Sequence, residues 1–98
     1  MIFVIAHLKV KPGTRDKCMA AAKPCIVETL KEKGCQSYEL FASATDPEGL
    51  VFVERWNERG DLDGHMRAPH MKVWRAAGAE FIVSRKIEII HPERVETL

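Results

Sequence analysis

The sequence predicts an α+β fold in which strand, helix, strand, strand, helix and strand follow one another and the sheet is antiparallel. Three observations carry this prediction: an alternating apolar pattern at the start, a helical apolar stripe after it, and two later strand patterns joined by a short turn. A chain of 98 residues holds one domain around one core. We therefore expect a single domain over residues 1–98, with 92–98 as a C-terminal tail.

The first strand is expected at residues 2–11. Its even positions are apolar from Ile2 to Val10 and share one face. The opposite face carries Phe3, Ile5, His7 and Lys9. Both faces therefore begin apolar, and the Pro12-Gly13 pair ends the strand.

A helix is expected over residues 15–33, begun by Thr14 or Gly13. Its apolar stripe, spaced by three and four residues, consists of Cys18, Met19, Ala22, Cys25, Ile26 and Leu30. Pro24 lies inside this stripe, so we expect a kink or local break there, because proline removes one backbone hydrogen bond. Gly34 is expected to end the helix as a left-handed cap.

Two further strands are expected at residues 35–43 and 50–57. The segment between them, residues 45–49, has the sequence TDPEG, which is typical of a turn. The two strands should therefore form an antiparallel hairpin. Tyr38 lies in its first strand, and alternation places Phe52, Glu54 and Trp56 on one face of its second strand.

The rest of the chain predicts a helical layer and a last strand. Asp61 can cap a short helical segment that ends at residue 67, and Pro69 suits the first turn of a helix over residues 69–80. The last strand is expected at residues 84–91. This order of elements is the ferredoxin-like βαββαβ plan, with two helices on one face of a four-stranded sheet.

The predicted sheet leaves one face without helices. The first and third strands are apolar on both faces, and a large open apolar face is uncommon on a soluble monomer. We therefore expect a homodimer in which two sheets pack face to face. The alternative is a sheet that remains partly exposed.

Composition argues against several classes of partner, and we expect a cytoplasmic protein. Fifteen Lys and Arg against 14 Asp and Glu give a net charge of +1, which argues against nucleic acid as a partner. No stretch has the roughly 18–20 apolar residues of a membrane span, and the first residues lack the features of a signal peptide. The three cysteines have no disulfide or zinc spacing, so we expect reduced thiols, with Cys18 and Cys25 as buried packing residues.

Two ionisable residues are expected among apolar neighbours. His7 shares its face with Phe3 and Ile5, where an imidazole is either a general base or a hydrogen-bonded core residue. Glu54 lies beside Phe52 and Trp56. A carboxyl group in such a place is either paired or has a raised pKa. The structural alternative for Glu54 is an ion pair with a helix residue such as Arg67, or a cap on a helix.

The other informative histidines are His65 and His70. They are five residues apart with Pro69 between them, which is poor spacing for a metal site, so no metal is expected. His65 follows the third strand at a distance that allows it to face Glu54. His70 lies in the first turn of a helix, where the neutral imidazole is favoured. The sequence has no GxGxxG, Walker or CxxC motif, so we expect no cofactor.

These residues together resemble a known family. The run Val53-Glu54-Arg55-Trp56, followed by Leu62, His65 and Pro69-His70-Met71, resembles the core signature of the antibiotic biosynthesis monooxygenase (ABM) family. The segment KGCQSY at residues 33–38 is similar to that family's entry into the second strand. The resemblance spans residues 2–91, and the pattern is most similar to the small cytosolic quinol monooxygenases of bacteria.

The resemblance implies a dimeric α+β barrel of ferredoxin-like subunits. It also implies oxidation of an electron-rich phenolic or quinol-like aromatic by molecular oxygen without a bound cofactor. By position, Tyr38 and Trp56 would orient the aromatic substrate, and Phe52 would form an apolar wall. The polar pair would be Glu54 and His65, with His7 and His70 as candidates for proton transfer. In the structural alternative, the aromatic residues are core and the Glu54–His65 pair only ties the helical segment to the sheet.

Two other functions stay open on the same scaffold. One is a non-catalytic domain that binds an aromatic metabolite or is associated with stress, and the other is an isomerase. The haem-degrading branch of the fold carries asparagine at the position of His7, tryptophan near His65 and histidine near Arg75. The sequence departs from that branch at all three positions.

Overall fold

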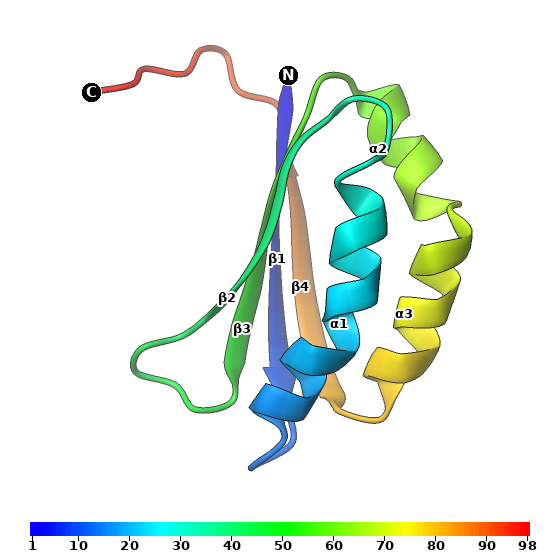
Figure 1. The fold of residues 1–98 in the computed structure, drawn as a ribbon. Helices are drawn as coiled ribbons and strands as arrows, with labels where there is room; N and C mark the ends of the chain where they lie inside the picture. Colours follow the sequence, from blue (N-terminus) through cyan, green and yellow to red (C-terminus); the bar gives the residue numbers. More distant parts are fainter.

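A computed structural model describes all residues 1–98, and it has the predicted α+β architecture. The helices form one layer over one face of a four-stranded sheet (Figure 1). In chain order the elements are β1 (Ile2–Val10), α1 (Arg15–Thr29), β2 (Cys35–Ala42), β3 (Gly49–Trp56), α2 (Arg59–Met66), α3 (Pro69–Ala79) and β4 (Ile82–Ile90). Each strand agrees with its predicted range to within two residues. After Ile90 the chain forms no helix or strand.

The sheet has the order β2-β3-β1-β4, and all neighbouring strands are antiparallel. Its register places Glu54 opposite both Val4 on β1 and Tyr38 on β2, so these three side chains share the face under the helices. His7 pairs with Val51 and Lys86, on the other face. The register thus decides which polar side chains can meet the helical layer.

Helix α1 differs from its prediction at two points. It runs through Pro24 without the expected break. The carbonyl that loses its partner belongs to exposed Ala20, where water can replace the missing bond. The helix also ends at Thr29 rather than residue 33, and Leu30 is 54% exposed while Thr29 is fully buried. The buried stripe therefore ends at Thr29 and not at Leu30 as predicted, because the chain turns away from the core after Thr29.

Gly34 has the predicted left-handed conformation, with φ of +79°, but it does not cap α1. Residues 30–32 continue from α1 as turns, and Gly34 lies in the bend that leads into β2. A Cβ atom at this position would be only 2.7 Å from the Cβ atom of Asp61 on α2. Glycine is therefore required twice, for its backbone angle and for the close approach of α2.

Helix α2 begins earlier than predicted. Glu58 is its N-cap residue, and the backbone N–H of Glu58 donates a hydrogen bond to Asp61 Oδ2 at 3.2 Å. Asp61 is thus the third residue of the helix rather than its cap, because a capping-box arrangement at Glu58 extends the helix by one turn. Helix α3 begins at Pro69, as predicted.

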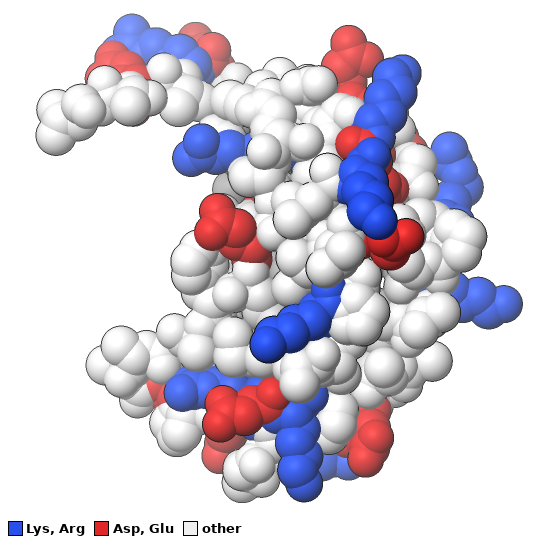
Figure 2. Space-filling model, viewed as in Figure 1, with Lys and Arg blue, Asp and Glu red and all other residues white.

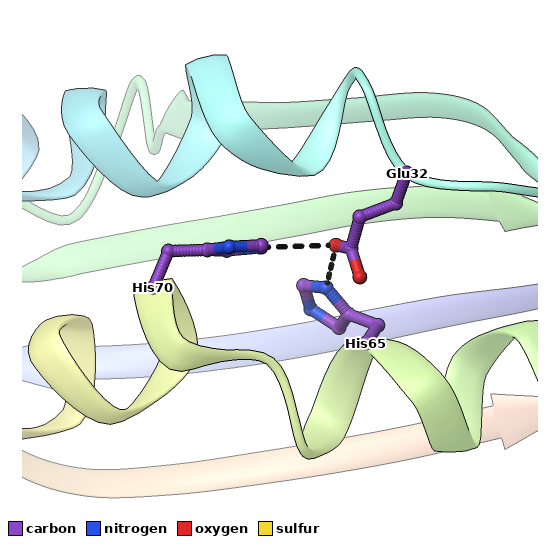
Figure 3. Close-up of side chains that lie close together, drawn as sticks. All are labelled: Glu32, His65 and His70. Carbon is purple, nitrogen blue, oxygen red and sulfur yellow. Dashed lines mark hydrogen bonds and ion pairs between the residues drawn. The ribbon is translucent and has the colours of Figure 1, made fainter.

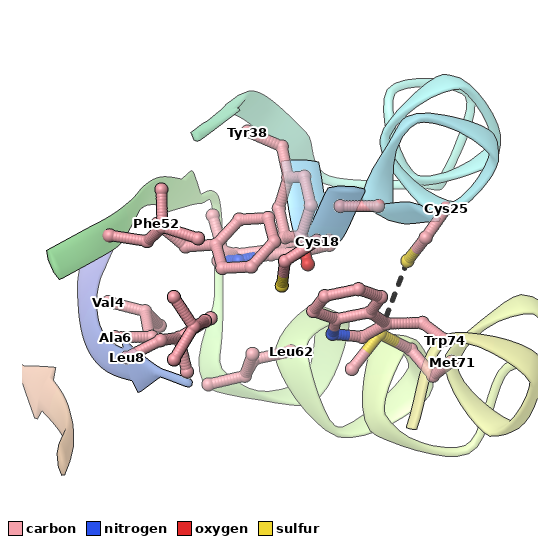
Figure 4. Close-up of a cluster of buried hydrophobic side chains, with 14 of the residues drawn as sticks. Val4, Ala6, Leu8, Cys18, Cys25, Tyr38, Phe52, Leu62, Met71 and Trp74 are labelled. Carbon is pink, nitrogen blue, oxygen red and sulfur yellow. Dashed lines mark hydrogen bonds between the residues drawn. The ribbon is translucent and has the colours of Figure 1, made fainter. Parts of the chain in front are cut away.

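The core lies between the sheet and the helices (Figure 4). It contains 15 buried hydrophobic residues, and rings from the sheet and from α3 meet within it. Phe52 packs 5.2 Å from Tyr38 and 5.9 Å from Trp74, measured between ring centroids. Cys18 and Cys25 are buried packing residues, as predicted, and Cys25 Sγ lies 3.6 Å from Met71 Sδ.

The surface carries charges of both signs. On the side shown in Figure 2, Lys and Arg alternate with Asp and Glu, and neither sign dominates. The sheet face without helices combines half-buried Phe3, Ile5 and Val53 with exposed His7 and Arg55. None of the helices has both the length and the apolar character that crossing a membrane requires.

Candidate functional site

A cavity of about 260 Å³ lies between the sheet and helices α2 and α3. Twelve of its 18 lining residues are hydrophobic, and they include Tyr38, Phe52, Leu62, Met71 and Trp74. On one side the lining reaches the edge strand β4, where Ile87 is 53% and Ile89 39% exposed. The cavity therefore has a mostly aliphatic lining with three aromatic rings, those of Tyr38, Phe52 and Trp74, and it reaches exposed residues along β4. An apolar pocket with a few polar groups is the usual form of a small-molecule site.

Glu54 is the buried carboxyl group of this pocket. It lies on β3, is only 5% exposed, and its Oε1 accepts a hydrogen bond from Trp56 Nε1 at 3.0 Å. Burial raises the pKa of Glu54 from 4.5 to about 7, although the bond from Trp56 opposes this rise. The structural alternative does not hold: Glu54 forms no ion pair with Arg67 and caps no helix. Glu54 can therefore exchange a proton near neutral pH.

His65 is the buried imidazole of the pocket, and its carboxylate partner is Glu32 rather than Glu54. His65 Nδ1 lies 2.6 Å from Glu32 Oε2, at the turn between α1 and β2 (Figure 3). The expected Glu54–His65 bond is absent, because α2 directs the Nδ1 edge of the ring towards that turn. Burial lowers the pKa of His65, and the bond to Glu32 opposes this shift. At neutral pH the ring is therefore uncharged.

His70 approaches the same carboxylate from α3. Its Nε2 lies 3.1 Å from Glu32 Oε2, and the two imidazoles point at one oxygen atom from two helices (Figure 3). His70 is half-buried and does not line the cavity. Glu32 and His70 thus lie behind His65 as seen from the pocket.

Two polar atoms remain available to a ligand. No buried side-chain nitrogen or oxygen lacks a hydrogen-bond partner in this structure. Glu54 Oε2 and His65 Nε2 take part in no hydrogen bond within the protein, and both residues line the cavity. The pocket therefore presents a carboxyl oxygen and a ring nitrogen to its contents.

The predicted aromatic residues divide between the wall and its support. Tyr38 and Phe52 line the cavity. Trp56 is fully buried and is not part of the wall. Its ring lies 4.8 Å from that of His65 while its N–H binds Glu54, so Trp56 supports both polar residues from behind. Burial also raises the pKa of Tyr38 far above its usual value, which keeps the phenol neutral.

His7 is separated from the pocket by the sheet. It projects from the exposed face of β1, whereas the cavity touches the neighbours Ala6 and Leu8 on the other face. The expectation that His7 shares a site with Glu54 and His65 is therefore wrong within one subunit. The alternation of β1 is the physical reason, since consecutive side chains point to opposite faces.

Glu32, His65 and His70 form the one group of side chains whose arrangement resembles a metal site. Each offers one donor atom, and the three atoms lie within 4.8 Å of one another. Two donors on one tetrahedral zinc ion at about 2.0–2.1 Å would lie about 3.3 Å apart. The 2.6 Å between Glu32 and His65 is shorter than that and is a hydrogen-bond distance. The arrangement thus fits a hydrogen-bonded network better than a coordination sphere.

Sequence reasoning assigned no site role to Glu32, Met71 or Trp74, although Met71 belongs to the segment that carries the family resemblance. A signal for Glu32 was present, because it directly precedes the segment at residues 33–38 that carries the family resemblance. Met71 and Trp74 follow His70 at helical spacing on the buried face of α3, and this spacing could have placed them on the wall.

The fold and the site together define a class: small α+β proteins in which a buried carboxyl group and a buried histidine line a mostly apolar pocket, with a second carboxylate and a second histidine behind that histidine. The sequence profile of the antibiotic biosynthesis monooxygenase family matches residues 1–77. The chain belongs to this family.

Several relatives agree with this assignment. YgiN of Escherichia coli, provisionally named as a quinol monooxygenase, is 26% identical over 94% of this chain and 98% of its own length. Rv0793 of Mycobacterium tuberculosis, provisionally named as a monooxygenase, is 37% identical over 83% of this chain and 79% of its own. A crystal structure of a conserved protein from Methanosarcina mazei superposes with a TM-score of 0.88 at 34% identity, covering 94% of this chain and 92% of that one. The names of the Escherichia coli and Mycobacterium tuberculosis relatives support an enzyme of this family.

Proposed function

We propose that the protein is a monooxygenase that oxidises a small quinol-like or phenolic aromatic with molecular oxygen and no bound cofactor. The observation that carries this proposal is the mostly apolar cavity, with the rings of Tyr38, Phe52 and Trp74 in its wall, that Glu54 and His65 also line. The provisional name of the Escherichia coli relative supports the quinol class. The active site is then the pocket under α2 and α3.

The size of the cavity limits the substrate. Its 260 Å³ is slightly below the range of about 300–1,000 Å³ in which drug-sized ligands bind. A ring system of one or two rings fits this space better than a larger polycyclic compound. Phe52 and Trp74 would contact the faces and edges of the rings, as aromatic side chains prefer.

His65 would act as the general base. Its bond to Glu32 holds the proton on Nδ1, and Nε2 then faces the pocket with a free lone pair. A quinol hydroxyl placed within hydrogen-bond distance of Nε2 would transfer its proton to the ring. The carboxylate of Glu32 stabilises the imidazolium that forms, so Glu32 is a positioning residue.

The oxidation itself would take its electrons from the substrate. A deprotonated quinol can transfer one electron to oxygen, and the resulting radical pair can combine to form a C–O bond. Insertion of one oxygen atom into a quinol gives a hydroxyquinone, and the second oxygen atom leaves as water with two substrate hydrogens. No further reductant is needed. The protein binds, deprotonates and excludes water from the reacting pair.

Glu54 would complete the site as a hydrogen-bond donor to the second oxygen of the ring. Its raised pKa keeps a large fraction of the carboxyl group protonated at pH 7. Trp56 fixes the orientation of this group through its N–H bond to Oε1. A neutral base and a protonated acid would therefore face one substrate from two sides.

Oxygen uptake with menadiol tests the proposal. We expect the purified protein to accelerate uptake above the uncatalysed rate, and His65→Gln to remove about 10²-fold or more of that acceleration. The control is His91→Gln, because His91 is exposed, follows the end of β4 and does not line the cavity. Binding of the substrate without any acceleration would favour the non-catalytic alternative. Product formation without oxygen would favour an isomerase.

We also propose that the functional unit is a cytoplasmic homodimer. The sheet face without helices has an apolar part at Phe3, Ile5 and Val53, and it also carries charges of both signs, including Arg55 and Glu39. A second copy would cover the apolar part and could pair these charges. Sedimentation at micromolar concentration should give a particle of twice 11.1 kDa, and a particle of 11.1 kDa would contradict the dimer. The three cysteines are free, as expected in a reducing compartment.

A further inference from the structure

Arginine side chains form part of the cavity wall. Arg59 comes from α2, Arg75 from α3 and Arg85 from β4, and all three line the same cavity as Glu54 and His65. All three arginines are exposed, whereas the acid and the imidazole are buried. The cavity is therefore polar at both ends, with a buried acid–base pair inside and cations at its open side.

Two of these cations have no acidic partner. Arg59 Nη1 pairs with Asp63 Oδ1 at 2.5 Å, so these two lining residues neutralise each other. Arg75 donates to the backbone carbonyl of Met66, which carries no net charge. Arg85 takes part in none of the ion pairs of the chain. Arg75 and Arg85 thus leave positive charge uncompensated at the opening.

The two arginines approach the opening from different layers of the fold. Arg75 belongs to the helical layer, and Arg85 belongs to the sheet, opposite Leu8 on the face that the cavity touches. The hydrophobic side chains of Ile87 and Ile89 follow Arg85 along the same face of β4. A ligand whose rings lie against these apolar residues would place its outer substituent near the arginines.

We propose that the substrate is a small aromatic that carries an acidic substituent, such as a carboxylate, and that Arg75 and Arg85 bind this group. This inference rests on the pocket being the substrate site. Guanidinium groups suit the position because they stay charged and bind planar oxyanions through two parallel hydrogen bonds. A neutral quinol of equal size would leave both cations unused.

The apolar walls argue for a ring as the body of the ligand. Twelve of the 18 lining residues are hydrophobic, and a sugar in this space would bury hydroxyl groups against them without partners. An aromatic ring loses little on entering such a space. The cations and the walls together therefore favour an aromatic acid over a phosphorylated sugar.

Binding of matched, unreactive probes tests this inference without turnover. We would measure 3-hydroxy-2-naphthoate and 2-naphthol by isothermal titration calorimetry at low salt and at high salt. The probes share a ring system and a hydroxyl group and differ by one carboxylate. We expect the naphthoate to bind about tenfold more tightly or better at low salt, which corresponds to about 1.4 kcal/mol. This preference should shrink at high salt.

Variants assign the preference to the arginines. Arg85→Gln and Arg75→Gln should each weaken naphthoate binding and leave naphthol binding unchanged. Arg67→Gln is the matched control, because Arg67 is exposed, makes no ion pair and does not line the cavity. Thermal unfolding of each variant confirms the fold. Because Arg85 makes no ion pair, its variant remains informative even if Arg75→Gln unfolds.

The outcomes separate this inference from the proposed function. Equal affinity for the two probes, or a preference that survives both arginine substitutions, would overturn the acidic-substrate inference while the aromatic pocket stands. If neither probe binds, both the pocket assignment and this inference fail. Tighter binding of the naphthoate that depends on Arg85 supports the inference, even if no oxygen is consumed with menadiol.

Discussion

Glu32 Oε2 lies 2.6 Å from Nδ1 of the fully buried His65, across 33 residues of sequence. This bond makes the two ring nitrogens differ: Nδ1 carries the proton and donates a hydrogen bond to Glu32, and Nε2 keeps a free lone pair. His70 Nε2, on the half-buried side chain at the start of α3, lies 3.1 Å from the same Glu32 oxygen. The reactivity of His65 should therefore depend on Glu32, which lies outside the pocket.

Glu32→Gln should lower kcat/KM about tenfold or more, because a neutral amide stabilises neither the Nδ1–H tautomer nor the imidazolium as well as a carboxylate does. Nitrogen NMR of the His65 ring should show a loss of the Nδ1–H tautomer in this variant. Glu28→Gln is the control, since Glu28 is an exposed partner of Lys31. An unchanged tautomer and an unchanged rate together would show that the Glu32 contact only supports packing.

The pH dependence of kcat/KM should have two limbs. Activity should rise as pH passes the pKa of His65, which burial places below its usual 6.5, because the base must be neutral. It should fall as Glu54 ionises near its pKa of about 7, because the carboxylate cannot donate a hydrogen bond. Glu54→Gln should remove the falling limb and keep the rising one. A fall that persists in this variant would assign it to another group.

Glu54 should make stability depend on pH in the opposite sense to an ordinary ion pair. The pKa of Glu54 is about 7 in the folded protein, whereas the usual value of 4.5 applies to the unfolded chain. Between pH 4.5 and 7 the folded protein therefore holds a proton on Glu54 that the unfolded chain has lost. Stability should therefore fall as pH rises from about 5 to 8, by on the order of 3 kcal/mol. Urea unfolding of Glu54→Gln should lack this decrease, whereas exposed Glu88→Gln should retain it.

Two glycine substitutions separate backbone strain from steric contact. Gly13 and Gly34 have φ angles of +75° and +79°, but an added Cβ meets nothing within 4 Å at Gly13 and collides with Asp61 at Gly34. Gly13→Ala should cost about 1 kcal/mol, and Gly34→Ala should cost clearly more. Urea unfolding measures both. Equal costs would mean that α2 shifts easily away from the turn, and His65 with it.

Local patterns were sufficient to predict the elements and the shared faces of the strands. Alternation placed Phe52, Glu54 and Trp56 together, and the structure confirms that they share the face under the helices. The helical stripe predicted the burial of Cys18 and Cys25. These predictions hold because the direction of a side chain follows from backbone geometry within a few residues.

Contacts between distant segments were beyond such patterns. The sequence suggested Glu54 as the partner of His65, yet the carboxylate that reaches it is Glu32. The choice depends on how closely α2 approaches the turn after α1, and Gly34 permits that approach. The distance between α2 and the turn after α1 cannot be predicted from the spacing of residues along either segment.

The sequence by itself determined the α+β order, the family resemblance and the side chains that alternate on each strand. It could not determine which face of β1 the helices cover, because both faces begin apolar. Packing decided this by burying the even positions, which excluded His7 from the pocket and brought His65 to Glu32. The physical reason is that periodicity is a property of neighbouring residues, whereas burial and pairing depend on the tertiary arrangement of elements far apart in the chain.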